Sequence, residues 1–155
     1  MLHLVAALIL QTDSTQVSVS VRIYEVSSRF SIAETRTQRL KTGEVYGVVK
    51  TKAFEASLEK LVENKRAKVI SAPTIRTLSG YPASFSSTRD GREEGYEIDP
   101  SVGEGGILLK LRGLTNKQEA FGIRLTLKAD ESLAIIWKSG RQSMLTTVSP
   151  SVISG

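Results

Sequence analysis

Residues 16–27 read Gln-Val-Ser-Val-Ser-Val-Arg-Ile-Tyr-Glu-Val-Ser and carry the clearest strand pattern of the chain. Four β-branched residues alternate there with polar ones, namely Val17, Val19, Val21 and Ile23. A period of two with β-branched side chains predicts a strand with one buried face. Glu25 falls on the face of the valines, so we expect its carboxylate to lie at the margin of the core, in a structural ion pair or hydrogen bond.

One amphipathic helix is predicted over residues 51–64. Apolar side chains recur there at i, i+4, i+7 and i+8, which is one helical face, and they are Phe54, Leu58, Leu61 and Val62. Thr51 can cap the first turn through its hydroxyl, and Asn64 suits the C-terminal end. A short apolar run at residues 45–49 precedes the helix. We expect the helix to pack as a scaffold on a sheet.

Two strands and a turn are predicted after the helix. Pro73 cannot donate a hydrogen bond to a neighbouring strand, so it marks a break in the apolar run that begins at Ala67. Residues 74–78 resume as a strand, and Ser79-Gly80 is a two-residue turn of the kind that closes a hairpin. We therefore expect residues 81–87 to return antiparallel to residues 74–78.

Residues 87–106 break the alternation of apolar and polar residues. The stretch combines acidic residues with five glycines and one proline, which is typical of a long polar loop. Its acidic residues do not reproduce the spacing of a calcium-binding loop, so we expect no metal here. Beyond it, four strand-like runs separated by short connections predict an antiparallel meander, at residues 107–112, 121–128, 133–137 and 144–148.

The chain has 155 residues and is 40% hydrophobic and 24% charged, which favours one folded domain, here residues 16–150. It has no cysteine and one histidine, His3, which excludes disulfides, thiolate metal sites and multi-histidine zinc sites. The glycine-rich stretch at residues 103–106 lacks the helix and the Lys-Ser/Thr pair of a phosphate-binding loop. We expect a protein that is not an enzyme and has no cofactor. The predicted class is α+β and β-dominated: an antiparallel sheet of about six to eight strands with one helix packed on it.

The formal net charge is +5, with the basic residues scattered and not interleaved with aromatic ones. This pattern predicts a solvated surface and no nucleic-acid partner. Residues 1–10 include an apolar run, Leu4 to Leu10, which is shorter than the ~20 residues of a membrane-spanning helix. Two interpretations stay open for it: the apolar part of a secretory signal, or a buried first segment of the domain.

The order of the segments resembles the β-domain of the secretin family. That resemblance rests on the strand ending in Glu25-Val26-Ser27, on the segment Ala67–Ala83 after the helix, and on the strand at residues 122–127. The residues that match the family's motifs are Glu25, Val69, Ile70, Ser71, Pro73, Gly80, Ala83 and Gly122.

Secretins are ring-forming outer-membrane channels of type II and type III secretion, type IV pili and filamentous phage export. The resemblance implies a non-enzymatic assembly domain that forms a homo-oligomer, contributes strands to an outer-membrane protein-export channel, and meets other secretion-apparatus proteins in the outer membrane or periplasm. By position, residues 87–106 correspond to the family's gate, with Gly103, Gly105 and Gly106 as its flexible points. The chain lacks the family's N-terminal ring domains, and Lys and Arg stand opposite the apolar faces of its strands. The alternative is a soluble periplasmic adaptor that recruits a partner by adding a strand to an open sheet edge.

Overall fold

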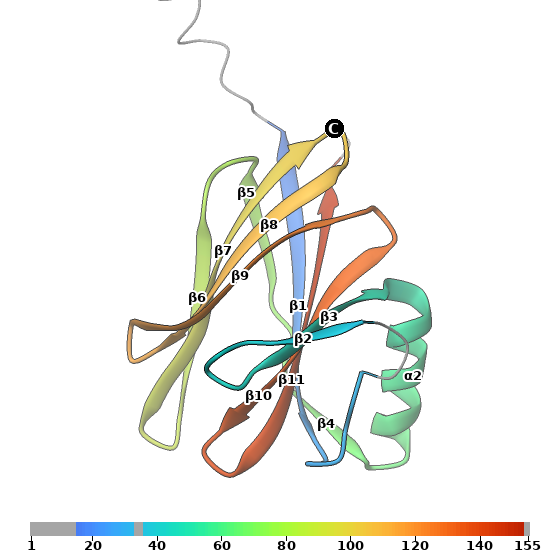
Figure 1. Cartoon of the computed structure of the whole chain (residues 1–155), viewed down its shortest axis with the longest axis vertical. Coiled ribbons are helices and arrows are strands. Elements are labelled where there is room, and N and C mark those ends of the chain that lie inside the picture. Colours follow the sequence, from blue (N-terminus) through green and yellow to red (C-terminus); the bar gives the residue numbers. More distant parts are fainter. Residues whose placement is uncertain (1–14, 33–35, 154–155) are drawn as a thin grey trace, which may run out of the picture.

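A computed structural model describes residues 15–32 and 36–153 of the chain, which form a three-layered, β-dominated fold (Figure 1). Within these residues the chain forms eleven strands and one helix. In order they are β1 (Gln16–Val26), β2 (Thr37–Arg39), β3 (Val45–Lys50), α2 (Thr51–Glu63), β4 (Ala67–Ser71), β5 (Thr74–Leu78), β6 (Ala83–Arg89), β7 (Arg92–Gly103), β8 (Gly106–Thr115), β9 (Gln118–Leu127), β10 (Glu131–Ser139) and β11 (Gln142–Val152).

The strands form two antiparallel sheets that face each other. Sheet A has seven strands in the order β2-β3-β10-β11-β1-β4, with β5 also paired to β1, and sheet B has the order β6-β7-β8-β9. The β-dominated class, the antiparallel pairing and the single helix are as predicted, but the prediction of one sheet is wrong. Alternating strands leave an apolar face that must be covered, and here sheet B covers the inner face of sheet A.

The predicted hairpin of residues 74–78 and 81–87 is also wrong. β5 pairs with β1 in sheet A, whereas β6 pairs with β7 in sheet B. Ser79 and Gly80 carry the chain from one sheet to the other, and hydrogen bonds fix this corner. The N–H of Gly80 donates to the carbonyl oxygen of Pro100 at 2.8 Å, and the N–H of Val102 donates to the Ser79 hydroxyl at 2.9 Å.

Residues 87–106 are strands and tight turns, not the predicted long loop. Asp90 and Gly91 form the two-residue turn between β6 and β7, both with positive φ (50° and 75°), as a primed hairpin turn requires. Along β7 the side chains alternate, so that Tyr96 and Ile98 are buried while Glu97 stays half-exposed. The acidic residues therefore obscure the strand's alternation of buried and exposed residues in the sequence. The predicted meander is interrupted as well, because the chain changes sheets between β9 and β10.

The main core lies between the two sheets. Val17, Val19 and Val21 of β1 are at most 1% exposed, as the alternation predicts. They belong to one cluster with the inward side chains of β7 to β11, among them Ile98, Leu109, Leu111, Leu127, Leu133 and Ile135. This interface is why the fold needs neither disulfides nor metal to be compact.

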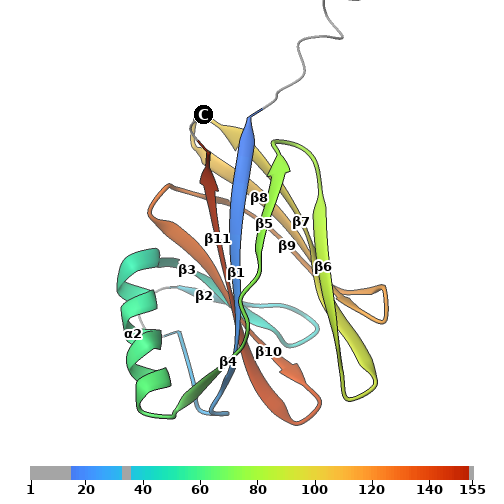
Figure 2. The same cartoon turned by 180° about the vertical axis from the view of Figure 1, so that it is seen from behind.

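Helix α2 covers part of the outer face of sheet A, on the side away from sheet B (Figure 2). Leu58 is its buried anchor and packs in one cluster with Tyr24, Val26, Ala134 and Leu145. Its bounds match the prediction, but the capping role of Thr51 does not. Lys50 occupies the N-cap position without a side-chain hydrogen bond. The Thr51 hydroxyl is instead 2.6 Å from the hydroxyl of Ser132 on β10.

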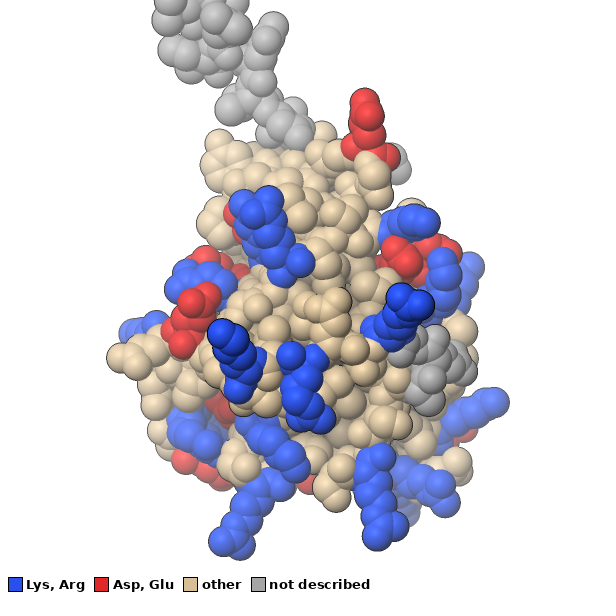
Figure 3. Space-filling model, viewed as in Figure 1, with Lys and Arg blue, Asp and Glu red and all other residues tan. Residues whose placement is uncertain are grey.

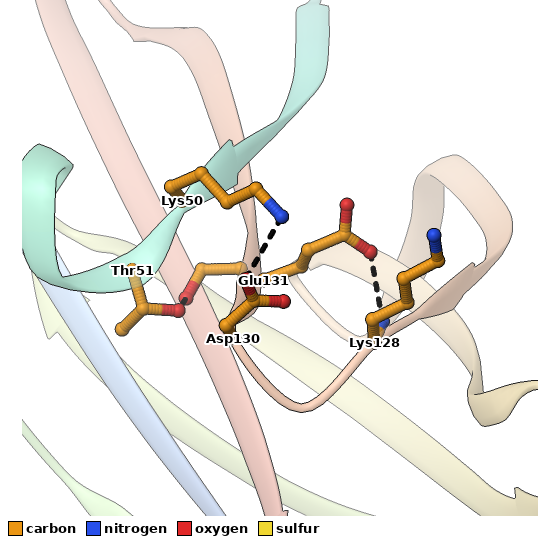
Figure 4. A network of polar contacts seen from close by, with 6 residues as sticks. Lys50, Thr51, Lys128, Asp130 and Glu131 are labelled. Carbon is orange, nitrogen blue, oxygen red and sulfur yellow. Dashed lines mark hydrogen bonds and ion pairs between the residues drawn. The ribbon is translucent and has the colours of Figure 1, made fainter.

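A polar network ties the start of α2 to the turn before β10 (Figure 4). Lys50 Nζ lies 2.9 Å from Asp130 Oδ2, and the N–H of Thr51 donates to the carbonyl oxygen of Asp130 at 2.9 Å. The N–H of Lys128 donates to Glu131 Oε1 at 2.8 Å, which closes the turn itself. These contacts set the angle at which the helix leaves β3.

The segment at residues 1–10 lies outside the described residues. Among the residues described, no helix has the length and apolar character to cross a membrane.

Candidate assembly edges

β4 and β5 together form an open edge of sheet A among the described residues. Both strands pair with β1, one with each half of it, and neither has a neighbour on its other side in sheet A. Pro73 joins them, and its carbonyl oxygen accepts a hydrogen bond from the N–H of Val21 at 2.9 Å. The pairing shifts register between Ile23 and Tyr24, where Ile70 is the extra residue. Residues 67–78 thus form one bent edge strand, which we call the β4–β5 edge.

This edge carries most of the exposed large apolar side chains of the described residues. Val69, Ile70 and Leu78 on the edge are 45%, 37% and 36% exposed, and Tyr81 just beyond it is 50% exposed. The other exposed large apolar residue, Val152, lies at the end of β11. An open strand edge with apolar side chains is a site where another chain can add a strand.

The β4–β5 edge is also basic. Within residues 67–78 Lys68 and Arg76 are basic and no residue is acidic, and the wider stretch of residues 64–89 contains no aspartate or glutamate. Like charges placed opposite each other destabilise a strand pair, so this edge is unsuited to pairing with the same edge of a second copy. A partner strand with acidic or neutral side chains suits it better.

Three further strands are at sheet edges. β6 borders sheet B on the side of β5, so two edges of the sandwich lie together there. The opposite edges are β9 in sheet B, which contacts β10, and the short strand β2 in sheet A. Unlike β4–β5, β9 carries charges of both signs, including Glu119 and Arg124. The molecule therefore offers different edges on its two sides.

The residues of the family motif gather around the β4–β5 edge and the corner after it, with two exceptions. Val69, Ile70 and Ser71 lie on β4, Pro73 joins β4 to β5, Gly80 forms the corner, and Ala83 begins β6. Gly122 stands apart on β9, opposite Arg112. Glu25 lies on β1, opposite Lys68 of the edge strand.

Glu25 has a partner, as its position predicts. Its carboxylate Oε2 lies 3.6 Å from Arg89 Nη2, at the end of β6. Arg89 also contacts Gln142 and the sulfur of Met144. The side chains of Glu25 and Arg89 are 35% and 25% exposed, so this is a partly screened pair that ties the two sheets together.

The glycines of the candidate gate are at the turn between β7 and β8. Gly103 pairs with Gly106 as the last rung of that hairpin. Gly106 has φ of +127°, and a Cβ there would lie 2.2 Å from the carbonyl oxygen of Leu127, so this position requires glycine for a close backbone approach. A Cβ at Gly105 would meet nothing within 4 Å. In this structure Gly106 fixes a turn, and its part in a gate stays a prediction.

Buried polar groups between the sheets form a small network that the sequence pattern did not reveal. Trp137 Nε1 donates to the Thr146 hydroxyl at 2.8 Å, and the Tyr96 hydroxyl lies 2.7 Å from the same oxygen. The Tyr96 ring packs against Phe85, Phe121 and Trp137, with centroids 5.7, 6.3 and 6.4 Å away. Burial raises the pKa of Tyr96 above its usual value of 10.0. The network is satisfied internally, which is typical of a structural role.

The outer face of sheet B carries charge pairs across its strands. Arg112 on β8 contacts Glu97 on β7 and Glu119 on β9, each at 3.1 Å. The hydrogen bond to Glu97, with that to Glu119, raises the pKa of the Arg112 guanidinium above its usual value. Such exposed pairs set strand register more than stability.

A cavity with a volume of about 560 Å³ lies between the β2–β3 hairpin, residues 28–32 and the end of β10. Phe30, Ile136 and Trp137 form its apolar lining. Two cations at its rim are bonded to the fold itself. Arg39 donates to the carbonyl oxygen of Gly43 at 3.2 Å, and Lys138 donates to the Ser143 hydroxyl at 3.0 Å.

No group of three or more His, Cys, Asp or Glu side chains in the described part of the chain could hold a metal ion. A scan against protein-family models finds no match, and searches of curated proteins and of solved structures find none either. The resemblance to the secretin β-domain thus stays a prediction from the sequence. The structure adds one observation to this prediction: the sandwich has open strand edges on both sides, and the edges on the two sides differ.

Proposed function

We propose that this chain is a non-enzymatic assembly domain that joins copies of itself through its open strand edges, as the resemblance to the secretin β-domain implies. The observation that carries the proposal is the β4–β5 edge, which is unpaired in the sheet and holds Val69, Ile70 and Leu78 in exposed positions. An edge of this kind gains both backbone hydrogen bonds and apolar burial when a strand is added to it.

The geometry favours head-to-tail addition. The β4–β5 edge and β6 lie on one side of the sandwich, and β2 and β9 lie on the other. Contacts between two unlike surfaces repeat from copy to copy and close into a ring when the rotation permits it. Repulsion between basic edges disfavours the alternative, in which two copies pair through identical edges. A ring that serves protein export across the outer membrane is the form that the resemblance predicts.

The second candidate function is an adaptor that adds an extended segment of another protein to the same edge. It is favoured by one observation, the absence of acidic residues from residues 64–89, which suits an acidic partner strand. The two functions differ in oligomeric state, because an adaptor stays a monomer on its own.

The test is the molar mass of the protein in solution, measured by light scattering over a wide concentration range with and without mild detergent. We expect wild type to form a closed oligomer, and Val69→Lys and Leu78→Lys each to shift the mass toward the monomer, because an edge lysine opposes strand addition. The matched control is Val152→Lys, which changes an equally exposed residue at the end of an interior strand and should leave the mass of wild type unchanged.

A wild-type protein that is monomeric at every concentration contradicts the assembly proposal and leaves the adaptor. Equal loss of oligomer in the edge variants and in Val152→Lys contradicts the assignment of the β4–β5 edge.

A further inference from the structure

One end of the sandwich collects the ends of several elements. β1 finishes there at Val26, which pairs with Ala67 at the start of β4 and with Ser143 near the start of β11. The turn between β10 and β11 and the C-terminal end of α2 lie at the same end, at the bottom of Figure 1. β1 begins and β11 finishes at the opposite end of the sandwich.

Six exposed basic side chains lie at these strand termini and turns, and we call them the basic end. They are Arg29, Lys65, Arg66, Lys68, Lys138 and Arg141. Lysine and arginine dominate the lower part of the surface in Figure 3, where little acidic surface is visible. The six residues come from three separate parts of the chain, residue 29, residues 65–68 and residues 138–141, so the fold brings the cluster together.

Two of the acidic groups near the basic end contact other side chains of the protein. Glu25 is paired with Arg89 at 3.6 Å, and Glu94 accepts a hydrogen bond from the Ser139 hydroxyl at 2.6 Å. Glu63 and Asp90 are exposed, and they are outnumbered by the six basic residues. Lys138 donates to the Ser143 hydroxyl at 3.0 Å, which leaves its charge uncompensated. The end therefore presents a net positive surface.

Two aliphatic side chains lie beside these charges. Val69 and Ile70 follow Lys68 on β4 and are 45% and 37% exposed. The exposed aromatic residue of the described chain, Tyr81, lies beyond the far end of β5 instead. Surfaces that bind single-stranded nucleic acid add aromatic side chains to basic ones for base stacking, whereas membrane surfaces attract basic side chains together with exposed apolar ones.

We propose that the basic end binds the surface of a bilayer that contains anionic phospholipids. Lysine and arginine side chains of the basic end meet the headgroup phosphates, and Ile70 with Val69 lies at the boundary between headgroups and acyl chains. This surface shares Val69 and Ile70 with the β4–β5 edge and contacts the membrane from outside. It does not rest on oligomer formation.

The experiment is co-sedimentation with vesicles of phosphatidylglycerol in phosphatidylcholine, compared with vesicles of phosphatidylcholine alone. Wild type should bind the anionic vesicles and not the neutral ones, and binding should weaken as salt is raised. The double variant Arg66→Glu/Arg141→Glu should bind at least about tenfold more weakly, because each charge near the surface contributes separately. Ile70→Gln should weaken binding by a smaller factor at every salt concentration.

The matched control is Lys52→Glu/Lys128→Glu, which makes the same change in net charge at two exposed lysines outside the basic end. It should keep wild-type binding, and circular dichroism should show both double variants folded. Absence of binding to anionic vesicles, or equal loss in the two double variants, overturns the proposal. Salt-sensitive binding to a DNA duplex together with no vesicle binding would overturn it in favour of a nucleic-acid surface.

Discussion

The two faces of sheet A are covered in different ways. Its inner face meets a complete second sheet, and Ile135, Leu133 and Val148 there are fully buried. Its outer face is covered by one helix through Leu58 and its neighbours, and beyond the helix it is lined with hydroxyl side chains such as Ser18, Ser20 and Ser149, which are half-buried. The same strands thus face a continuous apolar interface on one side and a partial cover on the other.

This difference teaches where the fold is fixed and where it can adapt. Two twisted sheets interdigitate along their whole length, so a change between them has little room to relax. A single helix can shift on its support, and hydroxyl groups near solvent can exchange a protein partner for water. We expect perturbations on the inner face to cost more than matched perturbations on the outer face.

The largest expected effect on the free energy of unfolding comes from substitutions that create a cavity, one on each face of sheet A. Ile135→Ala on the inner face should lower the free energy of unfolding by about 3–5 kcal/mol, and Leu58→Ala under the helix by about 2–3 kcal/mol, since the helix can move to fill part of the space. Both residues are at most 1% exposed, so burial does not distinguish them. Urea denaturation followed by circular dichroism measures both values. A larger loss for Leu58→Ala contradicts the comparison.

An intermediate effect is expected for Tyr96→Phe, which removes the hydroxyl that contacts Thr146 between the sheets. At neutral pH the free energy of unfolding should fall by only about 1 kcal/mol, because Trp137 still donates to Thr146. Ser132→Ala is the matched change on the outer face, where Thr51 and Ser149 lose a hydroxyl partner at 2.6 Å. We expect a loss of about 0.5 kcal/mol there, since neighbouring water can take its place.

The same tyrosine predicts an alkaline limit to stability. Burial raises the pKa of Tyr96 above 10.0, so the unfolded chain releases this proton first. Wild type should lose stability as the pH rises through 10, by about 1.4 kcal/mol per pH unit from this group, and Tyr96→Phe should lack that contribution. Equal pH dependence in the two proteins above pH 10 would show that Tyr96 is not buried as described.

The smallest effect is expected for the ion pair at the start of the helix. The hydrogen bond from Lys50 lowers the pKa of Asp130 below its usual 3.8, and the same bond raises the pKa of Lys50 above 10.5. Stabilisation of the folded state by the Lys50–Asp130 pair is therefore present between these two pKa values. It is lost as the pH falls through the lowered pKa of Asp130 or rises through the raised pKa of Lys50. The side chains are 62% and 66% exposed, so the contribution is strongly screened.

Nuclear magnetic resonance titration of the Asp130 carboxyl provides the measurement. In Lys50→Met the pKa should move up toward 3.8, with a change in the denaturation midpoint that is barely measurable. An unchanged pKa in Lys50→Met contradicts the contact.

The elements that could be predicted from the sequence are those with a local signature. The alternation of residues 16–27 and the helical face of Phe54, Leu58 and Leu61 are periodic, and both elements form as expected. Residues 92–103 were missed because their acidic and glycine residues mask a period of two, although Asp90-Gly91 is a strong hairpin signal. The exposed edge could have been noticed from the lack of acidic residues in residues 64–89.

The sequence by itself determined the β-dominated class, the helix that follows residue 50, the inward face of β1 and the exclusion of cysteine chemistry and multi-histidine metal sites, because these depend on composition and on local periodicity. The tertiary structure decided which strands pair, that the corner at Ser79-Gly80 changes sheets, and that Glu25 meets Arg89. It also brought the basic end together from three parts of the chain. Strand partners and charge clusters depend on contacts between residues far apart in the chain, and such contacts leave no mark on the pattern of any one segment.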